Sequence, residues 1–144
     1  MEIGATKAVQ DRLKTTKIEE SKGASLVFCW DTHLTKIKGR NVLFIVNASN
    51  RYTIAMTDIE PRNWNYYTMY IRSVIHGVMQ EMGYSEEQIA QYFKMSGDTT
   101  VTKTHGRKSV GGINRMVMDA QYFGKKLEKE AKYQWELSEY LNRD

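Results

Sequence analysis

The sequence is poor in cysteine and proline, the two residues that most strongly constrain a chain. It holds one cysteine, Cys29, and one proline, Pro61, among 144 residues. A single cysteine cannot form an internal disulfide, which indicates a reducing compartment. Cys29 stands in the apolar run 26–30 with no group nearby that would activate a thiol. We therefore expect a small core residue rather than a nucleophile.

Long apolar stretches are also missing. No run approaches the length needed to span a membrane, and residues 1–7 contain no apolar signal segment. These absences favour a cytoplasmic protein without a membrane partner. The length and the 41% hydrophobic content predict one globular domain over residues 1–144. The net charge of +4 permits attraction to nucleic acid or to an acidic protein without requiring either.

No established catalytic or metal-binding motif is present. His33, His76 and His105 do not stand at metal-ligand spacing from one another or from the cysteine, so we predict no metal and no cofactor. The segment 106–109, Gly-Arg-Lys-Ser, has the wrong glycine spacing for a nucleotide-binding phosphate loop. Asp31 and His33 share one face of a predicted strand, and an ordinary polar strand face explains that pair. We predict no catalytic residue.

The first half of the chain carries the patterns of strands. The apolar run 26–30 is followed by alternation over 33–38, a continuous apolar stretch within 41–47 and further alternation over 51–57. The continuous stretch predicts a strand buried on both faces. Because short polar turns separate these segments, we expect an antiparallel meander.

The second half carries mostly helical patterns. A helix N-cap is predicted at Asn63, a capping box begins at Ser85, and Gly124 interrupts the last helical pattern. The predicted helices span about 6–14, 63–82, 85–96 and 113–141, with a strand over 99–104 and a charged helical extension over 124–144. The predicted fold is α+β: a small antiparallel β-meander sheet packed against helices, with a long C-terminal helix.

A basic turn precedes the last predicted helix. A turn rich in glycine and cations at the start of a helix can hold a phosphate or a carboxylate. An exposed basic turn without a ligand fits the same residues equally well. The candidate anion-binding or nucleic-acid-binding residues are Lys103, His105, Arg107, Lys108 and Arg115.

Aromatic residues suggest a protein interface. Trp64 and Tyr66 stand at the start of a predicted helix, and Trp135 stands in the charged extension. Tryptophan and tyrosine contribute much of the binding energy at protein interfaces. The extension also carries two apolar stripes when drawn as one helix, which predicts that it packs on its own domain and on a second copy in a homodimer. One broad stripe laid on the domain is the alternative.

Several of these residues resemble a known family. Trp30, the run ending in Asn47, the pair Arg51-Tyr52, Thr102-Lys103-Thr104 and Asn114 are similar to a group of small bacterial, plasmid and phage proteins known as a domain of unknown function. The resemblance covers about residues 1–120, which suggests that the tail is an addition. Family members often carry His directly after the tryptophan, where this chain has Asp31. The resemblance implies that Trp30, Asn47, Tyr52, Lys103 and Asn114 surround one site.

Three functions are open on the sequence. The leading hypothesis is a non-enzymatic binding protein, encoded by a phage or mobile element, that inhibits or recruits a host protein such as a nucleic-acid-handling or defence complex. Its mobile-element origin comes from the family resemblance alone. The second hypothesis is direct nucleic-acid binding through the basic turn 103–115. The third is an enzyme acting on a phosphorylated small molecule, with His105 or His33 as acid-base.

Overall fold

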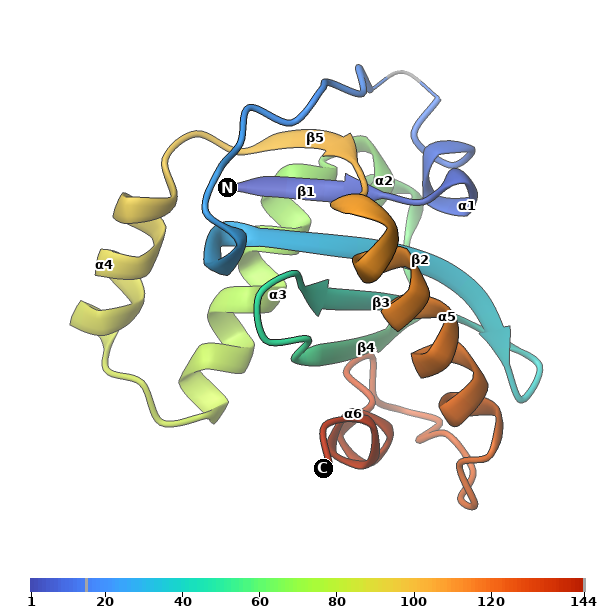
Figure 1. Cartoon of the computed structure of the whole chain (residues 1–144). Helices are drawn as coiled ribbons and strands as arrows, with labels where there is room; N and C mark the ends of the chain where they lie inside the picture. Colours follow the sequence, from blue (N-terminus) through green and yellow to red (C-terminus); the bar gives the residue numbers. More distant parts are fainter. Residues whose placement is uncertain (15, 144) are drawn as a thin grey trace.

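The computed structural model describes residues 1–14 and 16–143. The strands are β1 (Glu2–Ala5), β2 (Cys29–Ile37), β3 (Arg40–Asn47), β4 (Thr53–Thr57) and β5 (Thr100–Lys103). The helices are α1 (Lys7–Gln10), α2 (Pro61–Asn65), α3 (Tyr67–Glu81), α4 (Glu86–Ser96), α5 (Gly106–Gln121) and α6 (Trp135–Leu141), and a 3-10 turn, η1 (Leu26–Phe28), precedes β2. Figure 1 shows one five-stranded sheet with helices on both faces.

The sheet is mixed, so the prediction of a purely antiparallel meander is wrong. Its strand order is β4-β3-β2-β1-β5, and β1 runs parallel to both of its neighbours. Only β2, β3 and β4 form the predicted antiparallel connections. The parallel pairs arise because helices and long loops, rather than tight turns, connect β1 to β2 and β4 to β5.

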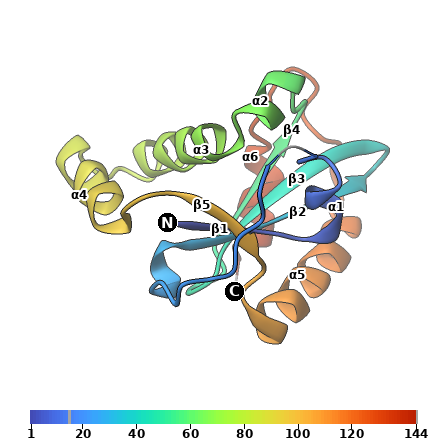
Figure 2. The same ribbon diagram turned by 90° about the horizontal axis from the view of Figure 1, so that it is seen from above.

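Strand β3, an interior strand of the sheet, is buried on both faces, as its apolar run predicts. Phe44 and Val42 point into one core, and Leu43 and Ile45 point into the other, with no exposed surface on any of the four. The core around Leu43 and Ile45 lies under α3 and includes Ile71 and Ile3 of β1, whereas the core around Val42 and Phe44 lies under α5. Figure 2 shows α2, α3 and α4 on one side of the sheet and α5 on the other.

The helix after Pro61 begins earlier than predicted and is divided. Glu60, rather than Asn63, is the N-cap of α2, and the side-chain oxygen of Asn63 accepts a hydrogen bond from the Glu60 backbone amide in a capping box. Tyr66 separates α2 from α3, which ends at Glu81. The capping box at Ser85 is confirmed, because its hydroxyl accepts a hydrogen bond from the Gln88 amide at the start of α4.

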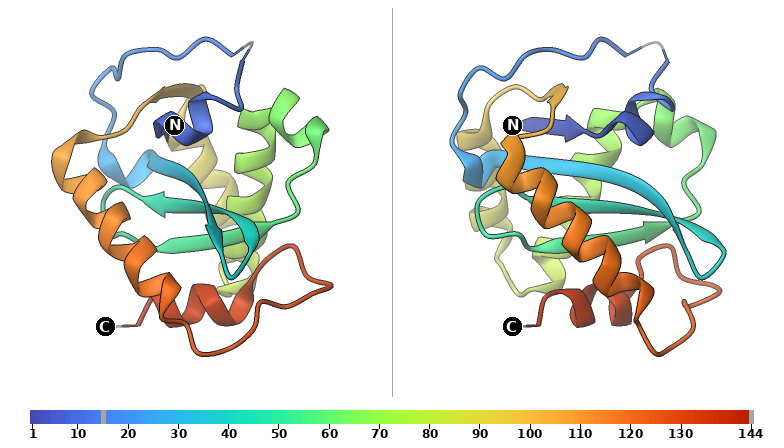
Figure 3. Two further views of the ribbon diagram at one scale, coloured as in Figure 1. Left: turned by 90° about the vertical axis from the view of Figure 1, so that its right-hand side faces the viewer. Right: turned by 45° about the vertical axis from the view of Figure 1, so that its right-hand side comes forward.

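The prediction of a long C-terminal helix is also wrong. Helix α5 begins at Gly106, so the Gly111-Gly112 pair lies inside it rather than before it, and it ends at Gln121. The next helix, α6, is short and starts only at Trp135. Figure 3 shows the irregular segment between them looping beneath the sheet. Likewise, the helix predicted over 6–14 is limited to Lys7–Gln10.

This irregular segment completes the sheet. The Thr57 amide donates to the Lys132 carbonyl, the Gln134 amide donates to the Ala55 carbonyl, and Tyr133 bridges Met56. An edge strand left open exposes unpaired backbone groups that invite aggregation. The tail therefore belongs to the folded domain because it closes the outer edge of β4.

Candidate functional site

A group of polar side chains is buried where β1, β2 and the start of α5 meet. Glu2 pairs with Cys29, and Gly4 pairs with Asp31, so all four residues lie on the face of the sheet that α5 covers. His105, the residue directly before α5, packs onto the same place. Glu2 is 4% exposed and Asp31 is fully buried. Buried charges are costly unless they are paired, so their partners decide what this site can do.

His105 joins the two carboxylates. Its Nδ1 lies 2.6 Å from Oδ1 of Asp31, and its Nε2 lies 2.8 Å from Oε1 of Glu2. An ionised carboxylate can only accept hydrogen bonds, so both ring nitrogens donate and the imidazole is cationic. The hydrogen bond to Asp31 raises the pKa of His105 and outweighs the opposing effect of burial. Both ring nitrogens of His105 thus have a carboxylate partner within the fold.

Asp31 also caps helix α5. Its Oδ2 accepts a hydrogen bond from the His105 backbone N–H at 3.2 Å and another from the Ser109 hydroxyl. The first turn of a helix carries unpaired N–H groups and a partial positive charge. The carboxylate of Asp31 accepts a hydrogen bond from one of these N–H groups and places a negative charge beside the partial positive charge. The start of α5 is therefore stabilised by a side chain of the protein itself.

The segment after α1 covers Glu2. The Ser21 hydroxyl donates to Oε1 of Glu2 at 2.7 Å, and the Lys22 amide donates to Oε2 at 2.8 Å. Burial by itself raises the pKa of Glu2, but hydrogen bonds from Ser21, His105 and Lys22 outweigh it and lower the pKa to about 2. Glu2 is therefore ionised at neutral pH.

Cys29 completes the buried cluster, and its burial is confirmed. Its Sγ lies 3.9 Å from Oε1 of Glu2 and 3.4 Å from the Ser25 carbonyl oxygen. Burial, reinforced by the carboxylates of Glu2 and Asp31, raises the pKa of the thiol to about 11. Such a thiol is a poor nucleophile at neutral pH. Among the described residues, Glu2, Cys29 and His105 present metal-ligand atoms within 4.8 Å of one another.

The residues of the predicted basic turn are divided among different surroundings. His105 is part of the buried cluster, and Arg107 is exposed on α5. Lys103 lies 3.0 Å from the Glu20 carboxylate in an exposed ion pair. The structure does not bring these three side chains to one place.

Three of the predicted residues, His105, Lys108 and Arg115, line one pocket between α5 and the turn that joins β3 to β4. The pocket has a volume of about 420 Å³ and is also lined by Arg51. The Arg51 guanidinium donates to the Lys108 carbonyl at 3.3 Å and lies where a side chain on Gly112 would stand. Gly112 therefore leaves room for the Arg51 side chain against α5, and it does not mark the start of the helix.

An apolar groove lies on the opposite face, between η1, α3 and α4. Its volume is about 520 Å³, and none of the described residues that line it is charged. The Trp30 indole N–H donates to the Tyr92 hydroxyl at 2.9 Å, which in turn donates to the Val27 carbonyl at 2.7 Å. The lining residues are Val27, Phe28, Trp30, Asn47, Asn50, Tyr52, Ile54, Ile75, Val78, Met79, Met82, Tyr84, Gln88, Gln91, Tyr92 and Met95.

The groove brings together three of the family-like residues, Trp30, Asn47 and Tyr52. Asn47 stabilises the local turn through its side chain. The side-chain NH₂ donates to the Val27 carbonyl, and the side-chain oxygen accepts from the Ser49 and Asn50 backbone amides. Asn114 is exposed on α5, and Lys103 ends β5, so neither lines this groove.

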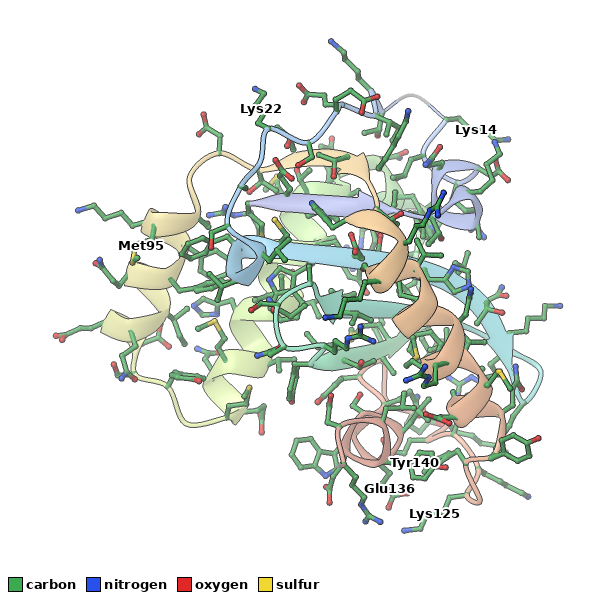
Figure 4. All side chains as sticks on the ribbon, in the orientation of Figure 1. Lys14, Lys22, Met95, Lys125, Glu136 and Tyr140 are labelled. Carbon is green, nitrogen blue, oxygen red and sulfur yellow. The ribbon has the colours of Figure 1, made fainter. Side chains whose placement is uncertain are left out.

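The predicted interface aromatics differ in their accessibility. Trp64 is only 7% exposed and stacks on Tyr67, whereas Tyr66 is 67% exposed. Trp135 is 47% exposed at the start of α6. Figure 4 shows Lys125, Glu136 and Tyr140 gathered around the same helix. Only Tyr66 and Trp135 of this set are available to a partner.

The sequence analysis missed Glu2 and Ser109 as members of the buried cluster. Glu2 is separated from His105 by 103 positions, so no spacing rule connects them. One signal was available: Asp31 directly follows an apolar run, and an acid within a buried strand needs a partner.

Comparison with known proteins gives a family but no characterised relative. No curated protein and no solved structure is detectably similar to the chain. Of the described residues, no helix is both long and apolar enough to cross a membrane. The profile of one family matches residues 2–144, which corrects the expectation that the tail is an addition. The chain therefore belongs to the family described as a domain of unknown function, DUF6933.

Proposed function

We propose that this protein is a non-enzymatic binding protein that captures an apolar segment of a partner protein in the groove between η1, α3 and α4. The observation that carries the proposal is the groove lining, which is aromatic and methionine-rich and has no charged member among the described residues. The centres of protein interfaces are depleted of charge and enriched in tyrosine, tryptophan and methionine. Methionine side chains also adapt to varied apolar partners.

The rim of the groove favours a polypeptide over a small molecule. Met82, Tyr84 and Met95 line the groove and are each about half exposed or more. A small molecule held in the hollow would leave these side chains in water, whereas a polypeptide segment lying across the groove covers them. Gln88 and Gln91 stand beside them and can pair with backbone groups of such a segment.

The biological setting extends the same proposal. The resemblance to plasmid and phage proteins supports a protein encoded by a mobile element that acts in the cytoplasm on a host protein, either inhibiting or recruiting it.

The test places a charge on the groove rim. A library of random peptides is selected against the protein, and the affinity of the selected apolar peptides is compared between the wild type, Met95→Lys and Met69→Lys. Both methionines are more than half exposed, but only Met95 lines the groove. We expect Met95→Lys to weaken binding by about ten-fold or more, since burying a charge is costly, and Met69→Lys to leave it unchanged. Equal affinities in all three proteins would refute the groove as the binding surface.

A second candidate function is binding of nucleic acid or another phosphate-bearing ligand. It is favoured by the meeting of Arg51, Lys108 and Arg115 at the pocket beside α5. In lysate of the host cell, a partner captured by the wild type and by Met95→Lys, but lost on nuclease treatment, would support this candidate. A partner lost with Met95→Lys and unaffected by nuclease supports the groove.

A homodimer is a separate proposal. Trp135 lines a shallow pocket together with Lys125, Arg143, Glu136 and Glu139. A surface that carries both signs of charge around an apolar centre is complementary to itself across a two-fold axis. The two apolar stripes predicted for one continuous helix do not form, because residues 122–134 are not helical.

A further inference from the structure

The buried cluster holds three different kinds of metal ligand. Glu2 offers a carboxylate oxygen, Cys29 offers a sulfur and His105 offers Nε2, and these atoms all lie within 4.8 Å of one another. Carboxylate, thiolate and imidazole are the ligand types that zinc takes in proteins, often three of them with a fourth position left to water. The side chains of Glu2 and His105 are each 6% exposed, which shields the position from bulk solvent.

The three ligands are held in place before any ion arrives. Glu2 and Cys29 are direct neighbours across the parallel strands β1 and β2, so the sheet fixes the distance between them. Asp31 accepts a hydrogen bond from Nδ1 of His105 and thereby turns Nε2 toward the other two ligands. A carboxylate on the outer nitrogen of a metal-binding histidine is the usual arrangement that orients the ring and raises its basicity.

The distances require only small movements. Zinc bonds of about 2.0–2.3 Å in tetrahedral geometry separate neighbouring ligand atoms by about 3.3–3.6 Å. Here Oε1 of Glu2 lies 2.8 Å from Nε2 of His105 and 3.9 Å from Sγ of Cys29. One separation is shorter and one longer than the ideal, and the third, between Sγ of Cys29 and Nε2 of His105, is at most 4.8 Å, so side-chain shifts of up to about 1 Å bring the three atoms to tetrahedral spacing.

The charge also balances. Without an ion, two carboxylates share one imidazolium, which leaves one negative charge in excess. When a divalent cation binds, the Nε2 proton and the thiol proton leave for solvent and the three ligand atoms bond to the metal. The buried cluster then holds the same net charge as before, so the exchange does not add an uncompensated charge to the interior.

We propose that Glu2, Cys29 and His105 bind a zinc-class divalent transition-metal ion that ties β1 and β2 to the start of α5. The polar segment that contains Ser21 and Lys22 covers Glu2 by two hydrogen bonds. This segment lies along the outer side of the molecule, where Figure 4 labels Lys22. The proposal does not depend on the groove, which lies on the other face of the sheet.

The experiment uses Co²⁺ as a spectroscopic probe of the full-length protein after removal of metals with a chelator. A thiolate bound to Co²⁺ gives a charge-transfer absorption in the near ultraviolet, and Cys29 is the only cysteine in the chain. We expect this absorption to saturate at one equivalent of Co²⁺ and to be lost when Zn²⁺ is added. His76→Gln is the matched control, because His76 and Glu86 form an exposed pair that can bind metal weakly.

Each outcome decides the proposal. The absorption should persist in His76→Gln and vanish in Cys29→Ser, whose folding is checked by circular dichroism. Absence of the absorption in the wild type at excess Co²⁺ overturns the proposal without recourse to any variant. Zn²⁺ uptake that is equal in the wild type and Cys29→Ala, measured by competition with a fluorescent chelator, overturns it as well.

Discussion

Gly4 lies directly against the carboxylate of Asp31. The two residues are neighbours across β1 and β2, and a Cβ atom on residue 4 would overlap Oδ1 of Asp31 and come within 3.1 Å of the Thr104 backbone. Asp31 in turn holds His105 and the first turn of α5. A missing side chain in the short strand β1 thus makes room for the carboxylate that joins the sheet to α5.

This contact predicts that Gly4→Ala is strongly destabilising. The new methyl group displaces Asp31 from its partners, so the variant suffers both overpacking and a weakened buried ion pair, at a cost of about 2–4 kcal/mol. The free energy of unfolding in urea measures the loss. Gly77→Ala is the matched control, because nothing lies within 4 Å of the added atom in α3, and we expect it to be neutral or stabilising. Equal stabilities of the two variants would show that Asp31 moves aside freely.

The paired charges predict a stability that falls at both low and high pH in metal-free protein. The pKa of Glu2 is lowered from 4.5 to about 2, so its contribution is present above pH 4.5 and is lost as the pH falls toward 2. The pKa of His105 is raised from 6.5, so its contribution is complete below pH 6.5 and is lost as the pH rises through the raised value. The groups facing the imidazole are Glu2, Asp31 and the Cys29 thiol.

Urea unfolding between about pH 3 and about pH 9 tests this dependence, which amounts to about 1.4 kcal/mol per pH unit for each proton linked to unfolding. Glu2→Gln should flatten the acidic limb selectively. A His33→Gln variant is the control for the alkaline limb: burial lowers the pKa of His33, the opposite direction from His105. If the loss of stability at alkaline pH disappeared in His33→Gln, the loss would arise from His33 and not from His105.

The sequence predicted the part of the fold that local patterns encode. Strand β3 was identified because a continuous apolar run such as 42–46 has few alternatives, and the Ser85 capping box is a local signal. Strand β1 has no comparable local signal, because four residues that include a glutamate and a glycine do not indicate a strand in the interior of a sheet. Its insertion between β2 and β5 depends on pairings far along the chain.

The same distinction explains what was missed at the candidate sites. The buried cluster joins residue 2 to residues 29, 31 and 105, and no periodicity relates those positions. The family resemblance implied one site around Trp30, Asn47, Tyr52, Lys103 and Asn114, and only the first three line the groove. The extent of the last helix was misjudged because residues 125–134 have helical composition but pair with the edge of β4 instead.

We predict that replacing Asn47 lowers the unfolding free energy by more than its place in a turn suggests. The side chain is nearly buried and makes three hydrogen bonds, to the Val27 carbonyl and to the Ser49 and Asn50 amides. Asn47→Ala leaves those backbone groups unpaired, so we expect a loss of about 2–3 kcal/mol in unfolding free energy. Asn50→Ala, which removes one exposed hydrogen bond to the Tyr52 amide, should cost less than about 1 kcal/mol. A reversal of this order would contradict the assignment of Asn47 as the anchor of the turn.

The proposed homodimer predicts a specific response to a charge at Trp135. Truncation after Gly124 does not test the dimer alone, because it also unfolds part of the domain. The truncated segment pairs with β4, and its Leu137 is buried in the core around Val42 and Phe44. Trp135→Asp instead changes a half-exposed side chain at the centre of the surface that also carries Lys125 and Glu136. We expect a dimer of the wild type in the micromolar range by light scattering and a monomer of Trp135→Asp, since an unpaired carboxylate at a two-fold contact faces its own copy. Tyr66→Asp, at an exposed aromatic between α2 and α3, should remain dimeric. A monomeric wild type refutes the dimer, and a dimer lost only in Tyr66→Asp moves the contact to the junction of α2 and α3.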